Sequence, residues 1–106
     1  MTFEFSLKII ALSEELRAIH KYEMASQIFR SGTSIGANIM EAQNAESKAD
    51  FIYKFKRSAK ESDEFHYWLK LCEASDLHPN PSKEVHSELR SISLIISKII
   101  SSSKKG

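Results

Sequence analysis

The chain has 106 residues, of which 42% are hydrophobic and 27% charged, and its formal net charge is +1. This composition is typical of one globular domain, and three glycines and two prolines are too few for the many turns of an all-β fold. The small net charge gives no argument for bulk attraction to nucleic acid or to a membrane. No apolar run approaches the roughly 20 residues of a membrane span. The single cysteine, Cys72, excludes an internal disulfide. We therefore expect one domain over residues 1–106, located in the cytoplasm.

Apolar residues recur at spacings of three and four along most of the chain, which predicts four amphipathic helices. Their expected ranges are roughly 3–20, 25–45, 47–76 and 81–101. The first helix has Thr2 as its expected N-cap and carries the core stripe Phe5, Ile9, Leu12, Leu16 and Ile19. The second carries the stripe Ile28, Gly32, Ile35, Ile39 and Ala42.

The third and fourth helices have the clearest start signals. The segment from Ser47 to Asp50 resembles a capping box, with Asp50 in place of the usual Glu or Gln. Asn80 is a good N-cap and Pro81 suits a first helical turn. The expected core stripes are Phe51, Phe55, Ser58, Ser62, Phe65, Leu69 and Cys72 in the third helix, then Val85, Leu89, Ile92, Ile96 and Ile99 in the fourth. We expect the final residues, SSSKKG, to fray.

Short connections between the helices, and apolar residues that repeat about every 3.5 residues, predict the fold class. The economical arrangement is an all-α, antiparallel, up-down-up-down four-helix bundle.

The second helix contains many small residues, including Gly32 and Gly36, which each cost about 1 kcal/mol relative to alanine inside a helix. Two interpretations remain open: a mobile, solvated helix, or a central helix with one face on its own bundle and another against a second subunit. In the second case a polar seam on one face would be hydrogen-bonded at an oligomer interface, either within the subunit or to Lys54 or Lys60 of a neighbouring chain. Its second-helix members are Arg30, Ser34, Asn38 and Glu41.

The third helix carries a basic arc that consists of Lys54, Lys56, Arg57 and Lys60. Such a cluster suits the phosphates of a nucleic acid. The alternative is a solvated or intersubunit ion-pair face, in which Arg57 pairs with Glu61 and Lys60 with Glu64. Tyr53, Tyr67 and Trp68 could stack on bases, but aromatic residues at helical spacing more often anchor core and subunit contacts, so we place Tyr67 and Trp68 at the oligomer interface.

No pattern in the sequence specifies catalysis, a metal or another cofactor. Asp63 and His66 have the Glu-x-x-His type of spacing found in di-iron bundles, but no second copy of this pair exists. Cys72 lies on a core stripe, which predicts a buried thiol and not a nucleophile.

Two groups of positions within residues 30–71 form a recognisable pattern: Arg30, Ser31, Ser34, Ile35, Asn38, Glu41 and Ala42 in the second helix, and Ser47, Asp50, Phe51, Lys54, Lys60, Glu61, Glu64, Tyr67, Trp68 and Leu69 in the third. In these positions the chain resembles the bacterial four helix bundle protein family, whose founding members are encoded in intervening sequences of 23S rRNA genes and were once labelled ribosomal proteins. One departure is Ser58, where relatives usually have an aliphatic residue.

The resemblance implies a homopentameric ring of four-helix bundles with no established catalytic activity. A related branch, the accessory variability determinants of diversity-generating retroelements, forms similar pentamers that bind nucleic acid and a reverse transcriptase. We therefore expect a non-enzymatic oligomeric scaffold that engages RNA or a nucleic-acid-processing protein, without a membrane partner. The alternative is a protein–protein interaction adaptor without affinity for nucleic acid.

Overall fold

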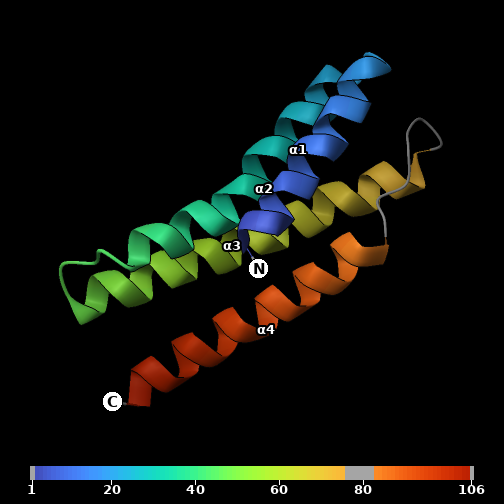
Figure 1. Ribbon diagram of the computed structural model, residues 1–106. Helices are drawn as coiled ribbons and strands as arrows, with labels where there is room; N and C mark the ends of the chain where they lie inside the picture. The colour runs from blue at the N-terminus through green and yellow to red at the C-terminus, as the bar shows by residue number, and fades with distance from the viewer. Residues whose placement is uncertain (1, 76–82, 106) are drawn as a thin grey trace.

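Four helices connected up, down, up and down make up the molecule (Figure 1). A computed structural model describes residues 2–75 and 83–105. The helices are α1 (Thr2–Ala18), α2 (Tyr22–Ala42), α3 (Lys48–Ala74) and α4 (Lys83–Lys105). The expected all-α four-helix bundle is confirmed.

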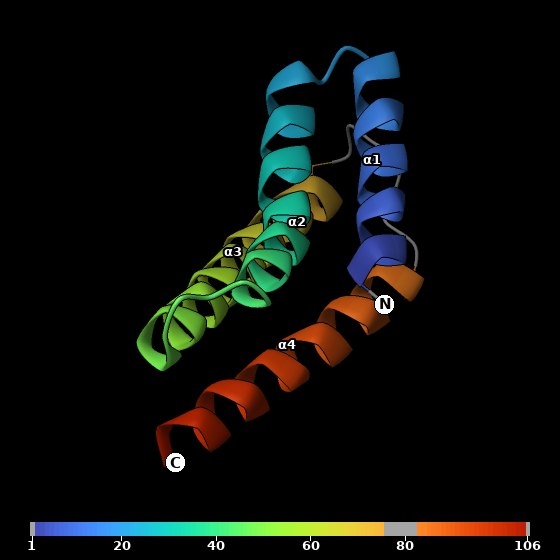
Figure 2. The ribbon, with the colours of Figure 1, turned by 60° about the vertical axis from the view of Figure 1, so that its left-hand side comes forward.

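The helices pack in chain order. α1 and α2 form an antiparallel hairpin, α3 runs back along α2, and α4 runs back along α3 (Figures 1 and 2). α4 also contacts α1, but its C-terminal half extends beyond α1 along α3 (Figure 2). The result is an elongated bundle with principal dimensions of 47 × 21 × 19 Å.

The core consists of the residues that the three- and four-residue spacings select. Its fully buried side chains include Phe5 and Phe65, whose rings meet edge to face with centroids 5.6 Å apart. Ile19 departs from the expectation, because it lies beyond the end of α1 and is 41% exposed. Ile39, Phe51 and Ile99 lie at the edge of the core and are half-buried.

The helix ends follow the capping signals in one place and depart from them in others. Ser47 caps α3 as expected, because its Oγ accepts a hydrogen bond from the Asp50 backbone N–H at 3.0 Å. Thr2 is not a cap but the first residue of α1. Asn80 and Pro81 lie outside the described residues, and α4 continues to Lys105 instead of ending near residue 101.

The turn between α1 and α2 is shorter than expected, and α2 begins at Tyr22 instead of near residue 25. The helix ends at Ala42 instead of near residue 45. His20 makes this turn possible with a φ of 63°, in the left-handed region that glycine or asparagine adopts more readily. Its Nδ1 lies 2.7 Å from the hydroxyl of Tyr22, which ties the turn to the first turn of α2.

α2 is packed on two sides, and Gly32 makes this possible. A Cβ at Gly32 would lie 2.7 Å from Ile9 Cγ2 of α1 and 3.1 Å from Phe65 Cε1 of α3. Gly36 faces the start of α1 with more room, since a Cβ there would lie 3.3 Å from Ser6 Oγ. These contacts favour the interpretation of α2 as a central helix over that of a mobile, solvated one.

Two buried serines of α3 bond to the helices on either side. Ser58 Oγ donates to the backbone carbonyl of Ile35 in α2 at 2.8 Å, and Ser62 Oγ lies 2.7 Å from Ser93 Oγ in α4. Ser58 therefore satisfies its hydroxyl within the core.

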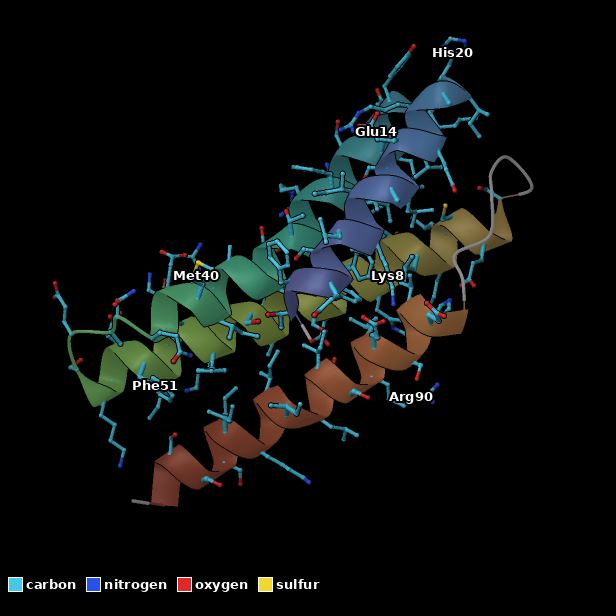
Figure 3. All side chains as sticks on the ribbon, in the orientation of Figure 1. Lys8, Glu14, His20, Met40, Phe51 and Arg90 are labelled. Carbon is cyan, nitrogen blue, oxygen red and sulfur yellow. The ribbon has the colours of Figure 1, made fainter. Side chains whose placement is uncertain are left out.

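Lys8 provides the polar link between α1 and α4 (Figure 3). Its Nζ bonds to Glu88 and lies 3.1 Å from Glu84. These bonds to Glu88 and Glu84 raise the pKa of Lys8.

Candidate nucleic-acid interface

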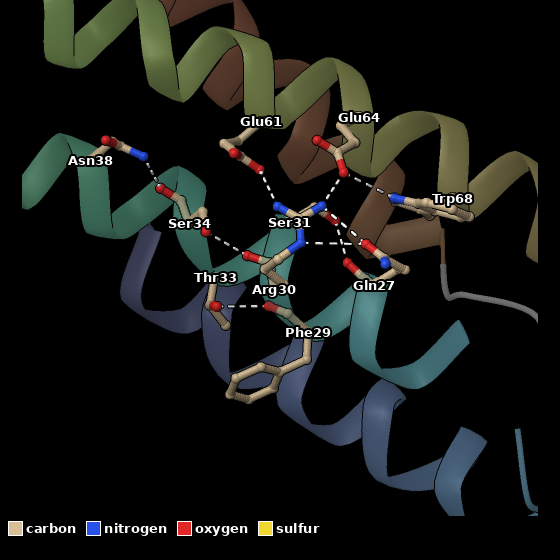
Figure 4. Close-up of polar contacts among 10 residues, drawn as sticks. All are labelled: Gln27, Phe29, Arg30, Ser31, Thr33, Ser34, Asn38, Glu61, Glu64 and Trp68. Atoms are coloured by element: carbon tan, nitrogen blue, oxygen red, sulfur yellow. Dashed lines mark hydrogen bonds and ion pairs between the residues drawn. The ribbon is translucent and has the colours of Figure 1, made fainter. Parts of the chain in front are cut away.

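Arg30, the first residue of the expected polar seam, joins α2 to α3 within one chain. Its guanidinium lies 3.2 Å from a carboxylate oxygen of Glu61 and also pairs with Glu64 (Figure 4). Gln27 Oε1 accepts two further hydrogen bonds from Arg30, at 3.1 and 3.3 Å, and Trp68 Nε1 donates to Glu64 at 3.4 Å. The structure therefore brings Arg30 and Trp68 together around Glu64.

The middle of the seam bonds to its own helix. Ser34 Oγ donates to the Arg30 carbonyl at 2.6 Å, and Asn38 Nδ2 donates to the Ser34 carbonyl at 2.8 Å (Figure 4). Asn38 is buried, and its Oδ1 accepts no hydrogen bond from the residues that the structure describes.

The far end of the seam also pairs within the chain. Glu41 of α2 accepts from Lys54 of α3 at 3.3 Å. Lys54, one of the four residues of the expected basic arc, is therefore paired with a member of the polar seam.

The other three residues of that arc belong to a longer exposed surface, which we call the basic face of α3. Its members share one side of the helix and are all exposed: Tyr53, Lys56, Arg57, Lys60, Tyr67 and Lys70. It extends for about 25 Å at 1.5 Å per residue. Sequence reasoning did not include Lys70, although its distance from Lys56 and Tyr67 matches helical spacing.

The expected pairs Arg57–Glu61 and Lys60–Glu64 do not form, because both carboxylates turn toward Arg30. Arg57 lies over the ring of Tyr53 instead, 5.8 Å from its centroid. Among the described residues, the structure pairs none of Lys56, Lys60 and Lys70 with a carboxylate. Lys56, Lys60 and Lys70 therefore carry charge that no carboxylate of the described residues neutralises, although Asp63 and Glu64 lie within the same arc of the helix.

The two aromatic residues assigned to an interface differ in their surroundings. Trp68 is half-buried and bonded within the α2–α3 contact, whereas Tyr67 is 57% exposed on the basic face. Tyr53 is 54% exposed on the same face. Two exposed rings among unpaired cations are the combination on which single-stranded nucleic acids stack.

The remaining candidates for chemistry are metal-ligating side chains and the single cysteine. Within residues 2–75 and 83–105, no cluster of three or more His, Cys, Asp or Glu side chains could hold a metal ion. Cys72 is fully buried, and this burial raises the pKa of its thiol.

An apolar surface on α1 was missed by sequence reasoning. Phe3, Leu7 and Ile10 form a stripe on the side of α1 away from the core, and they are 71%, 51% and 38% exposed. The spacing of four and three was visible in the sequence, but it was hidden by the stronger core stripe on the opposite side of the helix.

None of the four helices in the described ranges combines the length and hydrophobicity that a membrane crossing needs. No curated protein matches the sequence. A solved structure matches it with 38% identity and a TM-score of 0.84, over 93% of this chain and 94% of the other. That structure is a crystal structure of a protein with unknown function from the S23 ribosomal protein family, from Bacteroides thetaiotaomicron.

The family comparison covers nearly the whole chain, including the polar seam and the basic face of α3. The family model described as 23S rRNA-intervening sequence protein matches residues 1–101. The chain therefore belongs to the family of 23S rRNA-intervening sequence proteins.

Proposed function

We propose that the protein is a non-enzymatic, self-associating scaffold that binds single-stranded RNA along the basic face of α3. The observation that carries this proposal is the absence of carboxylate partners for Lys56, Lys60 and Lys70 in the described part of the chain. Lysines that are already neutralised by acidic neighbours have little to offer a phosphate, whereas these three are free to replace its counterions.

The exposed rings of Tyr53 and Tyr67 support a single strand over a duplex as the ligand. Bases that are unpaired can stack on aromatic side chains, whereas the bases of a duplex are stacked on each other. Self-association would multiply this surface, because each copy adds the same face to the assembly.

Salt-dependent binding of a fluorescent single-stranded RNA tests the proposal. A variant with Lys56→Gln, Lys60→Gln and Lys70→Gln should bind RNA more weakly. Its plot of log affinity against log salt concentration should be less steep by about 2, since each lost phosphate contact removes roughly 0.7 from the magnitude of the slope. A matched control with Lys21→Gln, Lys48→Gln and Lys98→Gln has the same net charge and should keep the wild-type slope.

The second candidate function is a protein-binding adaptor without affinity for nucleic acid. The exposed stripe of Phe3, Leu7 and Ile10 favours it, because contiguous apolar surface marks contacts between proteins. Failure of wild-type protein to bind RNA even at low salt would support the adaptor and overturn the scaffold for RNA.

A further inference from the structure

A groove of about 340 Å³ opens between α3 and α4. Its α3 side is lined by Ser62, Asp63 and His66, and its α4 side by Arg90, Ser93 and Leu94. Arg90 lies in the N-terminal half of α4, the part of this helix that runs alongside the C-terminal half of α3 (Figure 3).

The side chains of this groove suit a phosphate. Arg90 is exposed, and no carboxylate in the described part of the chain pairs with it. His66 offers a ring nitrogen from the opposite helix. In the Ser62–Ser93 pair one hydroxyl donates to the other, whose own hydrogen is left for a third acceptor. Guanidinium, imidazole and hydroxyl donors around one space are a recurrent way to hold a phosphate group.

The rest of the lining suits the other parts of a nucleotide. Leu94 is 58% exposed and gives the groove an apolar wall for a base or a ribose ring. Asp63 offers oxygens that accept hydrogen bonds from ribose hydroxyls, which distinguish RNA from DNA. The volume lies at the lower end of the range for small-ligand pockets, which is appropriate for one nucleotide.

The groove is next to the basic face of α3. Lys70 follows His66 by one helical turn, which brings their Cβ atoms within about 6 Å of each other. A strand lying along Lys56, Lys60 and Lys70 would therefore pass the mouth of the groove.

We propose that this groove binds one nucleotide of a bound RNA strand, with the phosphate on Arg90 and His66 and the ribose beside Leu94 and Asp63. The inference rests on the proposed function, because the nucleotide belongs to the strand on the basic face. It adds α4 to the surface that contacts the ligand, and it assigns a role to Asp63 and His66.

Methyl NMR of leucine-labelled protein tests the groove with adenosine 5′-monophosphate as the probe. Leu89 and Leu94 both line the groove, so their methyl signals should shift during the titration, while those of Leu7 on α1 should not. Adenosine, which lacks the phosphate, should cause much smaller shifts. Arg90→Gln should weaken the affinity for the monophosphate about tenfold or more, because a charge-assisted hydrogen bond is lost. Lys98→Gln, an equal change of charge at an exposed position of α4 outside the groove, should leave the affinity unchanged.

The same titration with a short RNA separates this inference from the proposed function. Shifts at Leu94 with both probes support the groove as part of the RNA site. RNA binding without any shift at Leu94 would overturn the groove as a nucleotide site but not the proposed binding of RNA to the basic face. An Arg90→Gln variant with the wild-type affinity for the monophosphate would have the same consequence. A monophosphate response without RNA binding overturns the RNA strand as the source of the nucleotide, and with it the proposed function.

Discussion

At the scale of single residues, Gly32 and Gly36 look alike in the sequence but have different surroundings in the structure. Gly32 is enclosed between α1 and α3, whereas Gly36 faces a single serine hydroxyl and the first residue of α1. A mid-helix glycine costs about 1 kcal/mol in helix propensity relative to alanine. At Gly32 the close approach of α1 and α3, which leaves no space for a side chain, explains why this cost is tolerated.

The two glycines should therefore respond in opposite directions to alanine. Gly32→Ala should lower the free energy of unfolding by about 1–3 kcal/mol, because the new methyl group would overlap Ile9. Gly36→Ala should be neutral or raise it by up to about 1 kcal/mol, since Ser6 can move and alanine favours the helix. Urea denaturation measures both values, and equal stabilisation by the two changes would contradict the close packing of α2.

At the scale of helices, charged residues of α3 divide between two tasks. Glu61 and Glu64 bind Arg30 of α2, and Lys54 binds Glu41, whereas Lys56, Lys60 and Lys70 face away from the bundle. The first group joins helices, and the second group is left for a ligand. Family-matching positions occur in both groups, so matching alone does not reveal which task a residue has.

Arg30→Met and Lys56→Met should separate these tasks. Removing Arg30 leaves Glu61 and Glu64 next to each other without a cation, so the free energy of unfolding should fall by about 1 kcal/mol. Removing Lys56 should change stability by less than about 0.5 kcal/mol but weaken RNA binding. A variant at Arg30 that lost RNA affinity without losing stability would assign the guanidinium to the ligand and not to the α2–α3 contact.

At the scale of the whole molecule, charge and apolar surface are distributed unevenly. Acidic residues outnumber basic ones in residues 1–46, and basic residues outnumber acidic ones in residues 47–106. The outer stripe of Phe3, Leu7 and Ile10 lies on the acidic half. Copies of this chain that met through α1 would cover the stripe and leave the basic face of α3 open to a ligand.

Leu7→Glu should dissociate such an assembly, because it places a charge in the middle of the stripe. We expect light scattering on wild-type protein to give a mass near five times the 12.1 kDa of one chain, as the family resemblance implies, and the variant to give the mass of one chain. Glu15→Lys changes the charge of α1 outside the stripe and should leave the mass unchanged. An unchanged mass for Leu7→Glu would place the interface on other helices, and a wild-type mass of one chain would overturn self-association.

The existence of four helices and nearly all core positions could be predicted from the sequence, because each helix carries an apolar stripe of helical period. The turn at His20 could not, since histidine adopts a left-handed conformation much less readily than glycine, and no glycine or proline marks residues 18–22. The pairing of Arg30 with Glu61 and Glu64 could not be predicted either. It depends on how α2 and α3 are rotated about their own axes, and apolar spacing within one helix does not determine the facing residues of another. For the same reason the sequence leaves open whether Glu61 and Glu64 neutralise Arg57 and Lys60, which in the structure they do not.

The buried hydroxyls of Ser58 and Ser62 determine how far α3 can slide along its neighbours. Helices that meet through aliphatic side chains alone can shift by one turn and recover similar contacts, because the stripes repeat. Any smaller axial shift of α3 would break the Ser58–Ile35 and Ser62–Ser93 hydrogen bonds together and leave buried hydroxyls unpaired, which costs about 1–3 kcal/mol for each group. α3 is thus fixed lengthwise against α2 on one side and α4 on the other, and this alignment keeps Arg90 level with His66 across the groove.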